Sequence, residues 1–287
     1  MRRRFALSAC GTYNRRLRMM TQTKSVLRDL GVRSGRGGIT VKSSKELDRM
    51  QEAGRVTGEV LRVLRESIAP GMTTREMDAI AEREIRARGA VPAFKGYRGF
   101  PATLCISLNE EIVHGIPGER RIQVGDVVGM DLGAIVDGLY GDSAVTVAVG
   151  DVSEGIRAQM ETGRAALFAG IAQARAGNRV GDVSYAVEQE ILRRGQYGIV
   201  REYVGHGIGT QLHEEPSVPN FGPGGHGPLL RPGMAIAIEP MVNFGGDATT
   251  VLDDDWTVVT MDGTVSVHYE HTVIITEGAP IITTKVD

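Results

Sequence analysis

Two consecutive segments after residue 43 carry apolar residues at the spacing of an α-helix. The first begins with Ser43-x-x-Glu46, a capping box, and its apolar positions recur at helical intervals until Pro70. The second begins with the same kind of signal, Thr73-x-x-Glu76, and again has one apolar face. The pattern therefore predicts two amphipathic helices, each of which buries one side.

This two-helix pattern returns about 106 residues further along the chain, and the strand-like segment 125–131 returns as 233–239, at an offset of 108. The matched residues are Gly54 with Gly163, Gly71 with Gly177, Glu76 with Asp182, Glu84 with Glu190, Arg88 with Arg194, Gly89 with Gly195 and Asp131 with Glu239. Two copies are too few for a solenoid. They predict two halves around a pseudo-twofold axis, with the strands in one curved sheet and the helices on one face of it. A chance likeness between amphipathic helices is the alternative, and the paired acids Asp131 and Glu239 argue against it.

Four acidic residues interrupt or adjoin apolar strand-like runs. They are Asp131 within 127–132, Asp142 at the start of 142–147, Glu239 after 235–238 and Glu270 before 271–275. Small residues two positions away, such as Gly129 and Ala237, share a strand face with the nearby acid and leave space beside it. Each acid alone would fit a solvated strand end. Together they predict buried carboxylates, which must be paired or must bind metal.

Four carboxylates in one pocket repel each other, at a cost on the order of 4 kcal/mol for each pair about 4 Å apart at an effective dielectric of 20. Carboxylate pairs can share protons, but four acids beside a histidine favour cations. Two divalent ions would balance the four negative charges. An oxygen-rich set with one imidazole suits Mn, Fe or Co at least as well as Zn.

Three of the six histidines lie in glycine-marked or acidic motifs. His114 begins His-Gly-Ile-Pro, His206 lies in Gly-His-Gly-Ile-Gly, and His213 precedes Glu-Glu-Pro. Flanking glycines permit close backbone approach, which favours a functional interpretation of the first two. The remaining histidines are expected to be structural; they are His226, His268 and His271.

The N-terminal segment differs in charge from the rest of the chain. Of the 33 basic and 35 acidic residues, eleven basic and one acidic fall within 1–42, which leaves 22 and 34 for residues 43–287. We expect residues 1–42 to be a disordered basic extension that can contact ribosomal or other nucleic acid. A transit peptide, or a true start at Met19 or Met20, is the alternative. Two cysteines indicate a reducing compartment, and no apolar run reaches the roughly 20 residues that span a bilayer.

Taken in order, the motifs of residues 43–285 resemble those of the type I methionine aminopeptidases. The segments that carry the resemblance are Glu111-Ile-Val-His-Gly-Ile-Pro117, Asp131 with Gly141-Asp142, Gly205-His-Gly-Ile-Gly209, Leu212-His-Glu-Glu-Pro216, Ile238-Glu-Pro-Met241 and Tyr269-Glu-His-Thr272. The resemblance implies an α+β pita-bread fold, with two helix–helix–strand halves around a mainly antiparallel curved sheet, and a catalytic domain over residues 43–287.

The resemblance also implies roles for individual residues. It places two divalent ions (Co, Mn, Fe or Zn) on Asp131, Asp142, His206, Glu239 and Glu270. It gives Glu239 a second role in proton transfer and places His114 and His213 against the substrate. The implied methionine pocket comprises Phe94, Tyr97, Phe100, Cys105, Leu212 and Trp256. Phe94 and Leu212 are less typical choices for the family, Tyr140 stands where histidine is common, and ordinary core packing is the alternative for each pocket residue.

The implied activity is removal of the initiator methionine from nascent chains whose second residue is small. We expect N-terminal methionyl peptides as substrates, a cytoplasmic location and a monomer. Prolidases and Xaa-Pro aminopeptidases share the ligand set but usually carry a folded N-terminal domain of over a hundred residues, whereas only a basic segment of 42 residues precedes the repeat here. Type II enzymes carry a helical insertion for which the 26 positions from His213 to Glu239 leave little room. A non-catalytic binding protein of the same fold would have lost ligands, and all five are present.

Overall fold

The computed structural model describes residues 38–285. Most of the predicted extension, 1–42, therefore lies outside the described residues. The compact unit begins at Ile39, and residues 39–42 belong to it although the charge pattern groups them with the extension. Ile39 forms a parallel bridge with Glu215, and the Lys42 side chain is buried. Residues 39–42 therefore pack with the unit that contains the helices and strands, although the charge pattern alone places them before it.

Within residues 38–285 the α-helices are α2 (Ser44–Ser67), α3 (Thr74–Ala87), α4 (Glu154–Gln173) and α5 (Val180–Arg194). Both predicted capping boxes form. A Glu46 carboxylate oxygen accepts the Ser43 backbone N–H at 2.8 Å, and Glu76 accepts that of Thr73 at 2.7 Å. These bonds satisfy amide groups that have no partner inside the helix. The two capping boxes therefore mark the N-terminal ends of α2 and α3, as predicted.

The strands form four antiparallel ladders, which divide the predicted curved sheet. The first is built from β1 (Val91–Pro92), β2 (Leu104–Leu108), β4 (Val127–Val136) and β5 (Leu139–Ala148), and the second from β7 (Gly205–Gly207), β8 (Glu214–Val218), β9 (Ala235–Ile238), β14 (His271–Ile274) and β15 (Ile281–Ile282). The smaller ladders comprise β6 (Gly198–Ile199), β10 (Met241–Asn243) and β13 (Ser266–His268), and β3 (Glu111–Val113), β11 (Thr249–Val251) and β12 (Val258–Thr260). A short 3₁₀ turn, η1, covers Tyr97–Gly99.

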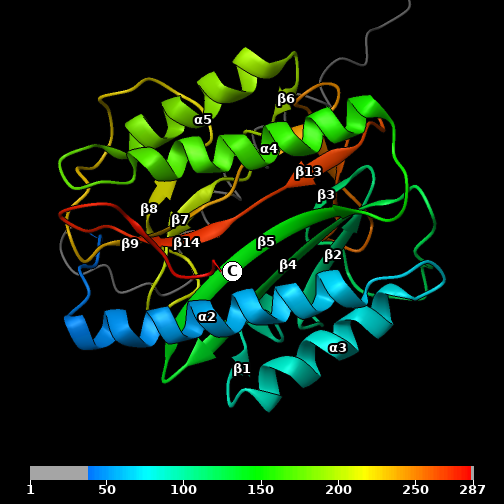
Figure 1. The fold of residues 1–287 in the computed structure, drawn as a ribbon, viewed down its shortest axis with the longest axis horizontal. Helices are drawn as coiled ribbons and strands as arrows, with labels where there is room; N and C mark the ends of the chain where they lie inside the picture. The colour runs from blue at the N-terminus through cyan, green and yellow to red at the C-terminus, as the bar shows by residue number, and fades with distance from the viewer. Residues whose placement is uncertain (1–37, 286–287) are drawn as a thin grey trace, which may run out of the picture. The chain divides into compact units, whose positions relative to one another are not determined.

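The two largest ladders meet where β5 runs beside β14 (Figure 1). The Glu270 amide donates to the Ala144 carbonyl at 2.9 Å, and the Asp142 amide donates to the Thr272 hydroxyl at 3.0 Å. The Ser143 hydroxyl donates to the Glu270 carbonyl at 2.6 Å. Side-chain hydroxyls thus replace part of the regular backbone hydrogen bonding between β5 and β14. The two ladders therefore lie side by side, but their strands are not joined by a regular ladder. We call this junction the seam.

The repeat predicted from the sequence is visible in local geometry. Gly71 and Gly177, which precede α3 and α5, have φ of +92° and +90°, and both need the left-handed region that glycine adopts freely. The Asp182 carboxylate accepts the Arg179 amide at 2.7 Å, as Glu76 does for Thr73. One matched pair differs: Gly89 has a left-handed φ of +75°, whereas the backbone at Gly195 is extended.

The helices bury one face of the strands, as the alternation of side chains predicts. On β4, Val128, Met130 and Leu132 pack with apolar residues of α2 and α3. On β9, Ile236 and Ile238 pack with α4 and α5. Figure 1 shows α2 and α4 in front of the strands on either side of the seam. The acidic residue Asp131, which alternates with these apolar residues along β4, therefore lies on the other strand face. No described helix has the length and apolar character that crossing a membrane requires.

Candidate metal centre

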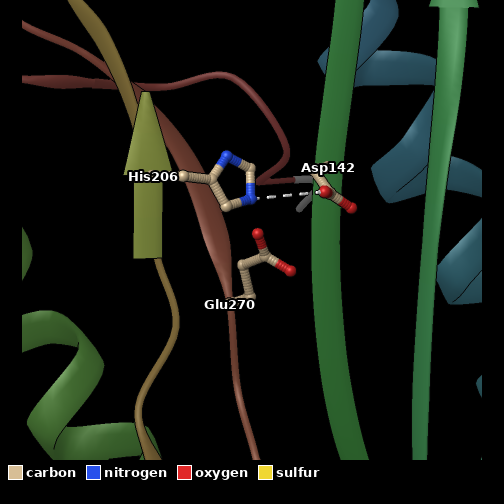
Figure 2. A group of neighbouring side chains, drawn as sticks. All are labelled: Asp142, His206 and Glu270. Carbon is tan, nitrogen blue, oxygen red and sulfur yellow. Dashed lines mark ion pairs between the residues drawn. The ribbon is translucent and has the colours of Figure 1, made fainter. Parts of the chain in front are cut away.

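Three side chains converge beside the seam. Asp142 comes from β5, His206 from β7 and Glu270 from the residue before β14, and all three are buried. One ligand atom from each lies within 4.8 Å of the others. Figure 2 shows them pointing toward one another, with the dashed line joining His206 Nε2 and Asp142 Oδ2, 3.9 Å apart. The long-range pairing of the two halves therefore builds a site that neither half contains alone.

Glu239 and Asp131 border the same group. Glu239 follows β9, and its Oε1 lies 3.6 Å from His206 Nε2. Asp131 lies in the middle of β4, directly opposite Ala144 of β5. The negative charges of Asp142 and Glu239 contribute to a raised pKa of Asp131, which places the three carboxyl groups in one electrostatic cluster.

Burial dominates the electrostatics of this cluster. It raises the pKa of Asp142 to about 7 and raises the pKa values of Asp131, Glu239 and Glu270 well above their usual range, with mutual repulsion adding to the effect. Burial also lowers the pKa of His206 to about 4, so its imidazole is neutral at pH 7 and its lone pair is available to a cation.

Several oxygens of the cluster have no hydrogen-bond partner. Asp131 Oδ1, Asp142 Oδ1 and Glu270 Oε1 are fully buried and unpartnered. Leaving such atoms unsatisfied is costly in a folded protein, especially on groups that tend to ionise. A divalent cation would satisfy these oxygens and remove the repulsion. The residues present therefore fit a metal, as the sequence predicts.

His213 and His114 lie on separate loops near this cluster. The His213 ring centroid is 4.1 Å from that of His206, and its Nδ1 lies 2.9 Å from the Tyr97 hydroxyl. His114 follows β3 with a left-handed φ of +61° and meets the rings of Tyr203 and Trp256 edge to face. Both imidazoles are thus held by aromatic neighbours.

His268 is a site residue that the sequence interpretation missed. Its side chain is buried, its Nε2 lies 3.7 Å from Glu239 Oε2, and that nitrogen has no hydrogen-bond partner. The signal was present in the chain: His268 precedes Glu270 by two positions, and alternate strand residues share a face. By contrast, His271 bonds the Thr284 hydroxyl and the exposed His226 bonds the Gly224 carbonyl, as expected for structural residues.

An apolar wall of packed side chains adjoins the metal cluster. The six predicted methionine-pocket residues belong to one packed cluster: buried Phe94, Phe100, Cys105 and Leu212, with partly buried Tyr97 and Trp256. Cys105 lies directly opposite Asp131 in the β2–β4 ladder, which joins this wall to the carboxylates. The Phe100 and Trp256 rings pack edge to face, 5.1 Å apart. The same cluster also contains ordinary core residues such as Met50 and Ile208.

Comparisons with known proteins agree with this geometry. The model of metallopeptidase family M24 matches residues 48–277. Methionine aminopeptidase 1 of Bacillus subtilis (strain 168) is 46% identical over 86% of this chain and 100% of its own length, and that of Mycobacterium tuberculosis is 46% identical over 90% and 99%. The crystal structure of a Thermotoga maritima methionine aminopeptidase matches with a TM-score of 0.85 at 40% identity, covering 86% of this chain and all of that one. The prolidase of Pyrococcus furiosus matches with a TM-score of 0.70 at 25% identity, covering 92% of this chain and 68% of that one.

Proposed function

The chain belongs to the M24 metallopeptidases and, within them, to the methionine aminopeptidases, which remove initiator methionine; we propose that the centre at the seam performs this reaction. The observation that carries the proposal is the convergence of Asp142, His206 and Glu270 from both halves of the chain. The fold and these three residues alone would also fit a prolidase, but the full-length relatives identify the substrate class as proteins and peptides with an N-terminal methionine.

Five residues would hold the metal: Asp131, Asp142, His206, Glu239 and Glu270. We propose two divalent ions, because two such charges balance four carboxylates, and Co, Mn, Fe and Zn all suit this donor set. When bound, such ions supply Lewis acidity and lower the pKa of a water molecule toward neutrality.

Glu239 is the proposed proton carrier. Its carboxylate lies between two imidazoles, with Oε1 3.6 Å from His206 Nε2 and Oε2 3.7 Å from His268 Nε2. Glu239 would accept a proton from the attacking water and deliver it to the departing amine nitrogen, so that one carboxylate serves both halves of the proton transfer.

His213 is the proposed donor to the scissile carbonyl oxygen. The Tyr97 hydroxyl, whose pKa burial raises, lies 2.9 Å from His213 Nδ1, and we assign the hydroxyl as the hydrogen-bond donor and Nδ1 as the acceptor. The imidazole proton then resides on Nε2, from which it can be donated as negative charge develops on the carbonyl oxygen. His114, on the neighbouring loop, would orient the scissile amide.

The apolar wall supplies the proposed specificity. A methionine side chain is flexible and polarisable, and it suits a pocket lined by aromatic rings, Leu212 and the Cys105 sulfur. We propose nascent chains with a small second residue as the natural substrates, acted on in the cytoplasm by a monomer. The basic residues before Ile39 would contact ribosomal RNA by their charge.

Peptide hydrolysis tests this assignment. After chelation, Met-Ala-Ser and Ala-Pro-Ser are offered while Mn, Fe, Co or Zn is returned stepwise. Met-Ala-Ser cleavage should vanish without metal and return with it, whereas Ala-Pro-Ser should remain uncut. Undiminished cleavage by the metal-free protein would contradict the proposed chemistry.

Substitution of His213 tests its separate role. His213→Ala should lower kcat about 100-fold or more, the loss typical of a missing donor to a developing oxyanion. His226→Ala is the matched control, because that imidazole is exposed and bonds only locally. Equal activity of the two variants would exclude His213 from the reaction.

A further inference from the structure

Residues 39–42, just before α2, cross the loop that carries His213. We call this segment the strap; in Figure 1 it is the start of the blue chain. Ile39 pairs with Glu215 in a parallel bridge, and the Lys42 amide donates to the Gly233 carbonyl at 2.8 Å. The Lys42 side chain then turns toward the loop, where its Nζ lies 2.9 Å from Glu214 Oε2.

The Lys42–Glu214 ion pair is almost fully removed from solvent. The two side chains are only 4% and 7% exposed. Taking both charges out of water is expensive, and a buried ion pair is often no more stabilising than apolar residues of the same size. Stability alone therefore gives little reason for this pair. The best-attested use of such pairs is to fix one arrangement of the chain.

The Glu214 carboxylate ties the strap to the loop from both sides. From the strap it receives the Lys42 ammonium and the Thr40 hydroxyl, the latter at 2.5 Å. From its own loop it receives the Gln211 amide at 3.2 Å and the Thr210 hydroxyl at 3.3 Å. A single carboxylate thus holds two segments that are far apart in sequence.

The fit around this carboxylate is close. A Cβ added at Gly209 would lie 2.4 Å from Lys42 Cε and 2.7 Å from Glu214 Oε1, so the loop has no room to shift toward the strap. The Gly209 carbonyl accepts the Tyr140 amide at 2.9 Å, which anchors the loop to β5 two residues before Asp142. His213, next to Glu214, is therefore fixed through its backbone on this side and through its ring by Tyr97.

We infer that Lys42 is a positioning residue for His213, acting through Glu214 and the loop 209–214. The inference rests on the proposed role of His213 in the reaction. The strap touches neither the five proposed metal ligands nor the apolar wall by any contact described above. Its loss should therefore change mainly how well His213 reaches the carbonyl oxygen, with a smaller effect on methionine binding, because Leu212 of the apolar wall lies on the same loop.

The test uses the full chain, loaded with metal, and follows Met-Ala-Ser hydrolysis. Lys42→Met should lower kcat by about 10- to 100-fold, as loss of a residue that orients an active-site group typically does, with a clearly smaller rise in KM. Lys95→Met is the matched control: Lys95 Nζ lies 2.7 Å from Glu82 Oε2, but the pair is 45% and 26% exposed. That variant should behave like the unsubstituted protein.

A double-mutant cycle separates positioning from a general loss of structure. If Lys42 acts through His213, Lys42→Met should cause no further loss of kcat in the His213→Ala background. The inference would be overturned if Lys42→Met lowered kcat by the same factor with and without His213→Ala, or if Lys42→Met left kcat unchanged. The proposed role of His213 would stand in either case. A His213→Ala variant with unchanged kcat would overturn both the inference and the proposed role of His213. If Lys42→Met does not fold, Thr40→Val can replace it, because it removes one hydrogen bond to Glu214. It should lower kcat by a smaller factor, and an unchanged kcat would contradict the inference.

Discussion

The two halves of the molecule build their share of the metal centre in different ways. In the first half, Asp131 and Asp142 lie on β4 and β5, ten-residue strands paired without interruption from Val127 to Ala148. In the second half, His206, Glu239 and Glu270 lie on or beside β7, β9 and β14, strands of three or four residues. The helices of the two halves repeat each other closely, but the strands do not.

This difference shows which side chains of the metal centre are positioned by the repeat and which are not. The long hairpin fixes two carboxylates by backbone pairing alone. In the second half the register shifts immediately after His206, and side chains bind the backbone instead, as when the Asn220 amide donates to the Glu239 carbonyl at 3.1 Å. Irregular positions in sheets commonly re-aim a side chain. The repeat therefore supplies one matched pair of carboxylates, Asp131 and Glu239, and the irregular pairing of the second half positions the imidazole of His206.

The largest effect is expected when one carboxylate is removed from either half, which tests whether both halves contribute to the metal centre. Asp142→Asn and Glu270→Gln should each lower Met-Ala-Ser hydrolysis by more than about 100-fold, the upper loss typical of residues that only support ligands. Bound metal, measured by elemental analysis after dialysis, should fall in parallel. Loss in only one of the two variants would mean that one half alone holds the catalytic centre.

The pH dependence of the stability of the metal-free protein compares the carboxyl groups of the two halves. The four carboxyl groups hold protons more tightly when folded, because burial and repulsion raise their pKa values. Unfolding therefore releases protons, and the free energy of unfolding should fall as pH rises from 7 to 8, by up to about 1.4 kcal/mol per pH unit for each carboxyl still protonated. His206, whose pKa is lowered to about 4, is neutral in the folded state throughout this range.

Urea unfolding after chelation measures this slope. Asp131→Asn in the first half and Glu270→Gln in the second should each flatten the pH dependence by a similar amount. Added metal should raise stability most at the higher pH. A metal-free protein that becomes more stable between pH 7 and 8 would contradict the raised pKa values.

The smallest effect concerns two matched helix glycines. A Cβ on Gly54 of α2 would lie 2.3 Å from Thr283 Oγ1 and 2.7 Å from the Thr283 carbonyl carbon, whereas one on Gly163 of α4 would meet only the Tyr269 and Val267 side chains, at 3.0 Å. Gly54→Ala should therefore cost about 1–3 kcal/mol of unfolding free energy. For Gly163→Ala, the roughly 0.5–1 kcal/mol gained in helix propensity should offset most of the strain. Equal costs in urea unfolding would show that the two glycines are structurally interchangeable.

The elements best predicted from the sequence are those whose cause is local. A helix start at Ser43 or Thr73 depends on a residue three positions away, and the turn at Gly71 needs only a left-handed backbone. Asp131 and Glu239 were recognisable because an acid within an apolar strand is conspicuous. Their five-residue grouping with His206 needed the family resemblance, since no spacing rule joins residues on separate strands.

The features that escaped prediction depend on distant contacts. Lys42 looks like part of a basic extension because its partner, Glu214, is 172 positions away. His268 was placed among structural histidines because Glu239, whose Oε2 lies 3.7 Å from its Nε2, follows a strand of another ladder. The division of the sheet follows from hydroxyl bonds of Ser143 and Thr272 across the seam, which residue type alone does not specify.

The seam also has a consequence for how the enzyme folds. Asp142 and Thr272 are 130 positions apart, so the chain must close a very long loop before β5 and β14 can meet. Closing such a loop costs entropy before any contact repays it, and contacts of this kind form slowly. Hydrolytic activity should therefore appear only after this long-range contact has formed, and recovery of activity after dilution from urea should track the slowest refolding phase.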